Sequence, residues 1–418
     1  LSKMNPGDHV RVSQNDSSYE GILLPSPNDQ YLILKLSGGY NVGISSEGAT
    51  IELITSKPDQ FFTPENGSDD ISNIIFDEDL PTLSLITTGG TIASTIDYRT
   101  GAVTSQFDVT DILRSIPDLS GLANYRGKIV ANILSENMTP SIWQDLAKAI
   151  SEEIEAGVDG VIVMHGTDTM QYTAAAISFM IRTPVPIIFT GSQRSSDRPS
   201  SDNLVNVICA VEAAKSTCAE VLICMHSNDS DNHCSLHRAT RARKNHTSKR
   251  SAFETIGNLP LGEVDYHTRS VTYRRAHHKR GEFKLSLQPN LNLNVELIKY
   301  TPGMDVNLLD ACSDKSGIVI EGTGLGHVHT DFVPHLSSLI KNGTHIVMTS
   351  QCIEGRVCSR VYDTGRDLLD IGVIEGGDML PGTAKVKLMW VLANTDDPSE
   401  SMQTSLAGEI TEPSRPWD

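Results

Sequence analysis

The stretch Gly160-Val-Ile-Val-Met-His-Gly-Thr-Asp-Thr-Met170 contains an apolar run, a turn with a glycine, and the start of a predicted helix. A short apolar run bounded by turn residues is typical of a strand buried on both faces. A buried strand that leads through a short loop into a helix is the repeating unit of a parallel α/β sheet. The stretch therefore predicts an α/β fold.

The same pattern recurs on both sides of this stretch. Apolar runs alternate with helical patterns, and this alternation favours a parallel sheet with helices on both faces. The predicted strands are Leu83–Thr87, Ile129–Leu134, Pro186–Thr190 and Val221–Met225, and the predicted helices are Ser141–Ala156, Thr173–Ile181 and Asn203–Lys215.

Two further units flank this body. Residues 1 to about 55 contain short strands separated by turn signals, which predicts a small β-barrel, and residues 55–79 read as a linker. A polar connector at 277–292 precedes a smaller α/β unit, and we expect residues 396–418 to form a loose terminus. The predicted organisation is a small β-barrel domain plus linker (1–75), an N-terminal α/β domain with the motifs described below (80–285) and a smaller C-terminal α/β domain (292–418).

The composition restricts the functions that the chain can have. The formal net charge is −18, from 34 Lys and Arg against 52 Asp and Glu, which argues against a surface built mainly for nucleic acid. The longest apolar runs fall short of the roughly 18 residues of a membrane span, and the first residues do not resemble a secretory signal. Seven cysteines without a CxxC pair disfavour a disulfide framework or a zinc site, so we expect a cytoplasmic protein.

Hydroxyl and carboxylate groups follow two of the predicted strands. Thr87-Thr-Gly-Gly-Thr91 ends the first strand, and His165-Gly-Thr-Asp168 follows Met164. Ligands bind beyond the carboxyl ends of parallel strands, so these groups could share a site. Plainer structural interpretations stay open, because Thr91 could lie in an ordinary turn and Thr167 or Asp168 could cap the following helix.

A threonine nucleophile needs an adjacent base, because its hydroxyl is a poor nucleophile at its ordinary pKa. A lysine can serve as the base when a carboxylate holds it and burial lowers its pKa. Lys244 and Lys249 both lie beyond the next predicted strand, and spacing does not choose between them.

Thr88-Gly-Gly-Thr91-Ile-Ala-Ser and His165-Gly-Thr-Asp168-Thr-Met together resemble the paired motifs of the bacterial-type L-asparaginase/glutaminase family, over roughly residues 80–418. The resemblance implies a two-domain α/β body that hydrolyses a side-chain amide. It assigns catalysis to Thr91, Thr167, Asp168 and a lysine, and it aligns Lys244 best with that lysine.

The resemblance also implies a set of substrate-binding residues. They are Ser135, Glu136 (where asparaginases usually have glutamine) and Tyr98, which follows the first motif at a short spacing. The resemblance leaves open whether Thr91 or Thr167 attacks first; we assign Thr91 as the nucleophile and Thr167 as the group that Lys244 and Asp168 activate.

Further segments, including Ser135-Glu-Asn-Met138 and Gln351-Cys-Ile-Glu-Gly-Arg-Val357, are similar to the glutaminase subunits of archaeal tRNA-dependent amidotransferases, which also carry an extra β-rich domain. This resemblance implies glutamine hydrolysis and transfer of ammonia to a second protein, which binds the tRNA and uses ATP and Mg²⁺. It implies that this chain holds no cofactor or metal. It also implies that the asparaginase-like body forms a homodimer, which makes a heterotetramer together with the second protein. A free-standing asparaginase or glutaminase and a non-catalytic scaffold are the alternative hypotheses.

Three other signals are set aside. Gly322-Thr-Gly-Leu-Gly-His327 is not a dinucleotide fingerprint, because histidine stands at the third glycine. His233 and His237 are interpreted as solvated loop histidines rather than as metal ligands. The basic stretch Arg238–Arg250 is interpreted as a loop beside the site or a partner surface rather than as a grip on nucleic acid.

Overall fold

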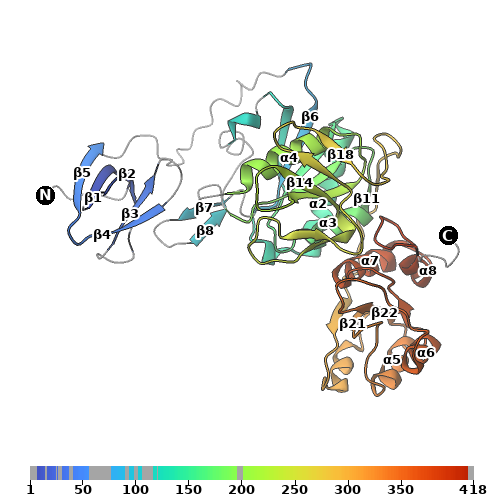
Figure 1. The fold of residues 1–418 in the computed structure, drawn as a ribbon. Coiled ribbons are helices and arrows are strands. Elements are labelled where there is room, and N and C mark those ends of the chain that lie inside the picture. Colours follow the sequence, from blue (N-terminus) through green and yellow to red (C-terminus); the bar gives the residue numbers. More distant parts are fainter. Residues whose placement is uncertain are drawn as a thin grey trace.

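The structure is a computed structural model, and Figure 1 shows its ribbon. It describes residues 7–14, 17–24, 26, 31–36, 41–55, 77–89, 94–97, 102–105, 116–119, 121–194 and 201–412. Within these residues, the search for a helix long and apolar enough to cross a membrane found none.

The central element is a sheet of eight strands in the order β18-β17-β14-β13-β12-β10-β6-β9. The five strands from β13 to β9 are parallel, as predicted, whereas β14, β17 and β18 continue the sheet in antiparallel pairing. The antiparallel part arises because a short turn, and no crossover helix, joins β13 to β14. The strands are β6 Thr82–Thr87, β9 Asn124–Ile129, β10 Gly160–Met164, β12 Ile187–Thr190, β13 Val221–His226, β14 His233–Arg238, β17 Gly262–Asp265 and β18 Val271–Tyr273.

Helices cover both faces of this sheet, which confirms the predicted α/β architecture. Helices α2 (Pro140–Glu155) and α3 (Met170–Met180) pack on the face that carries Val161 and Val163. Helix α4 (Asn203–Lys215) packs on the opposite face. Because alternate residues of β10 point to opposite faces and both faces are covered, the strand is apolar throughout.

One predicted strand is wrong in its position. Residues Ile129–Leu134 were expected to pair, but the strand is β9, Asn124–Ile129, and the chain then leaves the sheet. Parallel pairing with β6 sets this register, from Thr82 opposite Asn124 to Thr87 opposite Ile129. Residues 130–133 instead run beside the loop after β6, where the N–H of Ile133 donates to Thr88 O at 3.2 Å.

A second sheet of four parallel strands has the order β20-β21-β22-β23. Helix α7 (Pro381–Asn394) lies between this sheet and α3, and one apolar cluster joins residues of all three. Helix α5 (Phe332–Lys341) packs on the other face, and α6 (Asp363–Asp370) follows β22. The strands are β20 Val295–Lys299, β21 Gly317–Gly322, β22 His345–Ser350 and β23 Ile374–Glu375.

The expectation of a loose terminus is wrong for residues 397–412. Helix α8 (Pro398–Gln403) precedes a segment that is tied to α7 by Lys387 and Glu409, which are both fully buried and 2.6 Å apart. The Glu409 carboxylate also accepts the backbone N–H groups of Leu406 and Ala407. Charged residues read as surface in a sequence, so this buried pair was missed.

The N-terminal strands form a five-stranded antiparallel sheet in the order β4-β3-β2-β1-β5. The sheet curves around a small apolar core, and Gln14 of β1 donates to Ser45 O at the end of β4. The described strands form a barrel-like sheet that is not closed. The prediction of a small β-rich unit at the N-terminus is confirmed. The strands are β1 His9–Gln14, β2 Ser17–Leu24, β3 Tyr31–Leu36, β4 Asn41–Ser45 and β5 Thr50–Thr55.

Candidate active site

The candidate site lies at the carboxyl ends of β6 and β10, the edge of the parallel sheet at which the sequence predicts it. Thr88, just after β6, donates its N–H to Met164 O at 3.1 Å, so the two strand ends are adjacent. Gly89 has φ +98°, and a Cβ there would lie 2.4 Å from Ile133 O. Only glycine therefore fits this close approach of the two loops.

Thr91 and Tyr98 lie outside the described residues. Their predicted roles as nucleophile and as substrate-binding tyrosine therefore stay predictions. The described start of the first motif, Thr88 and Gly89, lies next to the end of β10.

The turn after β10 places Thr167 and Asp168. Thr167 is buried, and Asp168 is exposed, with 68% of its side chain accessible. Helix α3 begins two residues later, and no side-chain cap bond is formed at its N-cap residue Thr169. The capping role that the sequence left open for Thr167 and Asp168 is therefore not seen.

Lys244 completes a cluster with these two residues. Its Nζ donates to Thr167 Oγ1 at 2.8 Å and to Asp168 Oδ1 at 2.6 Å. Only 10% of the lysine side chain is exposed. A primary amine in contact with a buried hydroxyl and held by a carboxylate is an arrangement that can activate an oxygen nucleophile.

A short hairpin positions Lys244. Strand β15 (Ala242–Lys244) pairs with β16 (Phe253–Thr255), with Lys244 opposite Phe253. The backbone N–H of Lys244 donates to Gln171 Oε1 at 2.8 Å, which joins the hairpin to α3. Lys249 lies in the turn between the two strands and is exposed, so the geometry selects Lys244.

Ser135 is the substrate-binding candidate that the fold brings to the site. It begins a 3-10 helix, Ser135–Asn137, and is 8% exposed. A Cβ at Gly166 would lie 2.6 Å from Ser135 Cβ, and Thr169 Oγ1 donates to Ser135 O at 2.7 Å. Ser135 therefore lies against the turn that carries Thr167.

Glu136 follows Ser135 in the same 3-10 helix and is exposed. The role of Glu136 in binding substrate therefore stays a prediction.

His165 stands between β10 and the cluster. It is 1% exposed, and its Nδ1 lies 2.7 Å from Gly166 O. Burial lowers its pKa from 6.5 to about 4, so the ring is neutral at pH 7. A neutral ring adds no positive charge at the start of the turn that carries Thr167.

Sequence reasoning missed Gln171 and Arg241. Gln171 is one of several polar residues in α3, with Tyr172, Thr173 and Ser178, so no local signal singled it out. Arg241 precedes β15, is 3% exposed and donates to Asp378 Oδ2 at 2.9 Å and to Gly408 O at 3.0 Å. No local pattern pointed to it, because its partners come from the far end of the chain.

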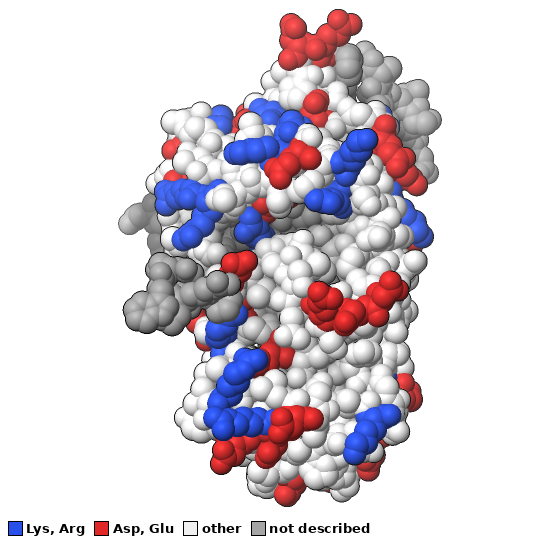
Figure 2. Space-filling view, turned by 90° about the vertical axis from the view of Figure 1, so that its right-hand side faces the viewer, with Lys and Arg blue, Asp and Glu red and all other residues white. Residues whose placement is uncertain are grey.

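The basic stretch Arg238–Arg250 lies beside the site, and several of its cations are paired. Arg238 contacts Glu220 at 2.7 Å, and Arg250 contacts Asp231 at 2.6 Å. On the face shown in Figure 2, Lys and Arg gather around a hollow in the upper half, with Asp and Glu among and below them. The paired cations fit a structural role better than a grip on phosphates.

His233 and His237 were expected in a solvated loop, but both lie in strand β14. His237 is 2% exposed, and its Nδ1 lies 2.9 Å from Thr255 Oγ1. Among the described residues, the search for groups of three or more His, Cys, Asp or Glu that could hold a metal ion found none.

Comparison with known proteins extends this picture. Family models match in three segments: "Asparaginase, N-terminal" at residues 82–278, "Glutaminase/Asparaginase C-terminal domain" at 294–404 and "GatD N-terminal domain" at 4–54. The thermostable L-asparaginase from Thermococcus kodakarensis has a similar structure, with a TM-score of 0.73 and 30% identity, over 79% of this chain and 100% of that chain.

Two curated relatives are GatD proteins, that is, the D subunits of glutamyl-tRNA(Gln) amidotransferases. The protein of Halobacterium salinarum is 61% identical over 424 residues, which cover 99% of each chain. The protein of Methanosarcina acetivorans is 49% identical over 97% of this chain and 98% of its own.

Proposed function

The chain belongs to the GatD family of glutamyl-tRNA(Gln) amidotransferases, and from this premise we propose that it hydrolyses L-glutamine and supplies the ammonia to a partner protein. The observation that carries the hydrolytic part is the contact of Lys244 Nζ with Thr167 Oγ1 and Asp168 Oδ1. The relatives' name supports the transfer part, in which the partner converts Glu-tRNA(Gln) to Gln-tRNA(Gln).

In the proposed reaction, Thr91 Oγ1 attacks the side-chain amide carbon of glutamine. Lys244 in its uncharged form accepts the proton of Thr167, Thr167 accepts the proton of Thr91, and Thr167 then passes that proton to the departing nitrogen. The C–N bond breaks, ammonia leaves and an ester remains on Thr91. Water then attacks this ester, which releases glutamate and restores the hydroxyl.

Asp168 has two parts in this proposal. Its 2.6 Å contact with Lys244 orients the amine toward Thr167. Its exposed side also presents negative charge to the substrate, so that Asp168 and Glu136 can face the α-ammonium group.

The buried hydroxyl of Ser135 is proposed to contact the α-carboxylate of glutamine, and Tyr98 is proposed as a further substrate-binding residue. Support for Ser135 comes from its place against Gly166, one residue before Thr167.

We further propose that the partner is GatE, which binds the tRNA and uses ATP and Mg²⁺, while this chain holds no cofactor. The asparaginase body pairs as a homodimer in this proposal, and two GatE partners complete a heterotetramer in the cytoplasm. The net charge of −18 supports a division in which the partner makes most of the tRNA contacts.

A free-standing L-asparaginase or glutaminase is the second candidate. The likeness to the Thermococcus kodakarensis enzyme favours it, because that whole chain is matched. The match of residues 4–54 to the GatD N-terminal domain and the full-length similarity to GatD proteins favour a role within an amidotransferase.

The experiment is ammonia release from L-glutamine by the purified chain, alone and with GatE, tRNA and ATP, together with formation of Gln-tRNA. We expect release to depend on the partner and Gln-tRNA to form from glutamine. Release that is equal with and without the partner would favour the free-standing enzyme. A complex that never cleaves glutamine would refute both the amidotransferase subunit and the free-standing glutaminase, and the same assay with L-asparagine tests the free-standing asparaginase.

A further inference from the structure

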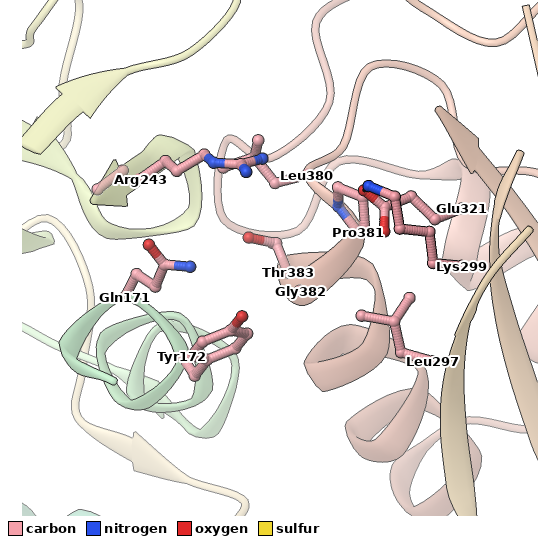
Figure 3. A pocket seen from close by; sticks show the side chains of 11 residues that line it. Gln171, Tyr172, Arg243, Leu297, Lys299, Glu321, Leu380, Pro381, Gly382 and Thr383 are labelled. Atoms are coloured by element: carbon pink, nitrogen blue, oxygen red, sulfur yellow. The ribbon is translucent and has the colours of Figure 1, made fainter. Parts of the chain in front are cut away.

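A cavity of about 210 Å³ lies beside the candidate active site but is separate from it. Residues of α3, β15, β20, β21 and the first turn of α7 line it (Figure 3). Neighbouring side chains of a strand point to opposite faces. In β15, Lys244 points to Thr167, whereas Arg243 lines the cavity.

One end of the cavity presents hydrogen-bond donors. Figure 3 shows Arg243, Gln171 and Tyr172 across the cavity from Lys299 and Glu321. Thr383 lies between these groups in the first turn of α7, and its hydroxyl already donates to Thr240 O at 3.2 Å. Within the part of the chain that the structure describes, no ion pair or hydrogen bond of the Arg243 guanidinium is found. Gln171 accepts the N–H of Lys244 through Oε1, which leaves its Nε2 group for the cavity. Glu254 is the cross-strand neighbour of Arg243 in the hairpin. A guanidinium that no anion contacts directly, with further donors around it, matches a carboxylate.

The opposite end carries one anion and one cation. Glu321, at the carboxyl end of β21, has 15% of its side chain exposed and lies 3.6 Å from Lys299 at the end of β20. Figure 3 shows both side chains together, across the cavity from Gln171 and Tyr172. Within the described residues, this long contact is the one ion pair found for the Glu321 carboxylate, so the carboxylate can still accept an ammonium group from a ligand.

The first turn of α7 forms the wall between these two ends. A Cβ on Gly382 would lie 2.4 Å from Tyr172 Cε1, so the tyrosine ring rests directly on the helix. The cavity is smaller than the roughly 300–1,000 Å³ of pockets for drug-sized ligands, which suits a small metabolite.

We propose that this cavity binds a free acidic α-amino acid of the L-glutamate type. Arg243 and Lys299 supply two positive charges and Glu321 one negative charge. An amino acid with two carboxylates and one ammonium has the complementary set. In the bound state one of the two carboxylates contacts Arg243 and the other contacts Lys299. The ammonium group contacts Glu321.

Gln171 gives this cavity a direct contact with the hairpin that carries Lys244. Binding of glutamate, the product of the proposed reaction, would therefore affect the position of Lys244 through Gln171. This consequence alone rests on the proposed function; the binding proposal does not.

The test is calorimetric titration of the full chain with L-glutamate and with glutarate, which lacks the ammonium group. The wild type should bind glutamate at least about tenfold more tightly than glutarate, as the loss of one ion pair implies. In Glu321→Gln this preference should disappear. In Arg243→Gln both ligands should bind at least about tenfold more weakly. Arg275→Gln, at an exposed position outside the cavity, serves as the matched control and should bind like the wild type.

Thr167→Val separates this site from the active site, and the melting temperature of each variant verifies its fold. The proposal is overturned if glutamate does not bind, if Arg243→Gln and Glu321→Gln bind it normally, or if only Thr167→Val abolishes binding. The titration needs no glutamine turnover, so the cavity can be shown to bind glutamate even if the chain is not a glutaminase.

Discussion

Lys244 Nζ lies 2.8 Å from Thr167 Oγ1, although the two residues are 77 positions apart in the chain. Thr167 is fixed by the end of a buried strand, and Lys244 is carried to it by a hairpin that is bonded to α3 through Gln171. The fold thus brings an amine to a buried hydroxyl, with Asp168 holding the amine from its exposed side. The proposed amide hydrolysis depends on this contact.

Replacing Thr167 separates the role of its hydroxyl from the role of its shape. Thr167→Val keeps the volume but removes the oxygen that Lys244 contacts, so kcat for glutamine should fall about 10²-fold or more. Thr167→Ser keeps the oxygen and should retain at least about a tenth of the wild-type kcat. Steady-state ammonia release measures both. Equal activity of the valine and serine variants would remove the hydroxyl from the mechanism.

The contact between Gly166 and Ser135 should tolerate no extra atom. A Cβ at position 166 would lie 2.6 Å from Ser135 Cβ, so Gly166→Ala must displace one of the two loops. Overpacking of this kind costs about 1–3 kcal/mol, and we expect a lower melting temperature together with a higher KM for glutamine. Gly43→Ala is the control, because a Cβ there meets nothing within 4 Å. A wild-type KM in Gly166→Ala would contradict the placement of Ser135 in the substrate site.

Stability should fall in mild acid because two histidines are buried in the neutral form. Burial lowers the pKa of His165 and of His237 from 6.5 to about 4. Between pH 6.5 and pH 4 the unfolded chain binds more protons than the folded chain, so the free energy of unfolding falls as the pH falls. At pH 5 each histidine should cost about 2 kcal/mol relative to pH 7.5.

Urea denaturation at the two pH values measures this loss. His237→Asn should reduce the loss by about 2 kcal/mol. His329→Asn, at a side chain that is 60% exposed, should leave it unchanged. A loss in His237→Asn equal to that of the wild type would show that His237 does not contribute.

The C-terminal segment should contribute strongly to stability. Glu409→Gln leaves the Lys387 ammonium buried without its counter-charge, and breaking a buried pair in this way costs about 3–5 kcal/mol. The melting temperature of Glu409→Gln should therefore fall by several degrees or more. Glu412→Gln, at an exposed position three residues further on, is the control and should melt like the wild type. Identical melting of the two variants would contradict the role of the pair.

The parts of the fold that the sequence predicted are those with strong local signals. The strand Gly160–Met164 and the helix Asn203–Lys215 have the predicted bounds. A continuous apolar run between turn residues marks the strand, and a longer, mostly apolar segment marks the helix. The position of β9 was not predictable in this way. Its register depends on pairing with β6, and neighbouring apolar residues outside the strand look the same.

The candidate site shows the same division. Thr167 and Asp168 follow a predicted strand, so their place at the sheet edge could be inferred from the sequence. The choice of Lys244 over Lys249 needed either the family resemblance or the hairpin register, in which Lys244 pairs with Phe253. The ion pair between Arg241 and Asp378 joins residues 137 positions apart, and no local sequence pattern predicts it.

The central claim is that Lys244 activates a hydroxyl for the cleavage of glutamine. The most direct test compares glutamine-dependent ammonia release by Lys244→Met and Lys249→Met in the complex with GatE. The two residues share one hairpin, but only Lys244 contacts Thr167. We predict that Lys244→Met lowers kcat at least about 10²-fold and that Lys249→Met keeps the wild-type kcat. Wild-type ammonia release by Lys244→Met would contradict the account.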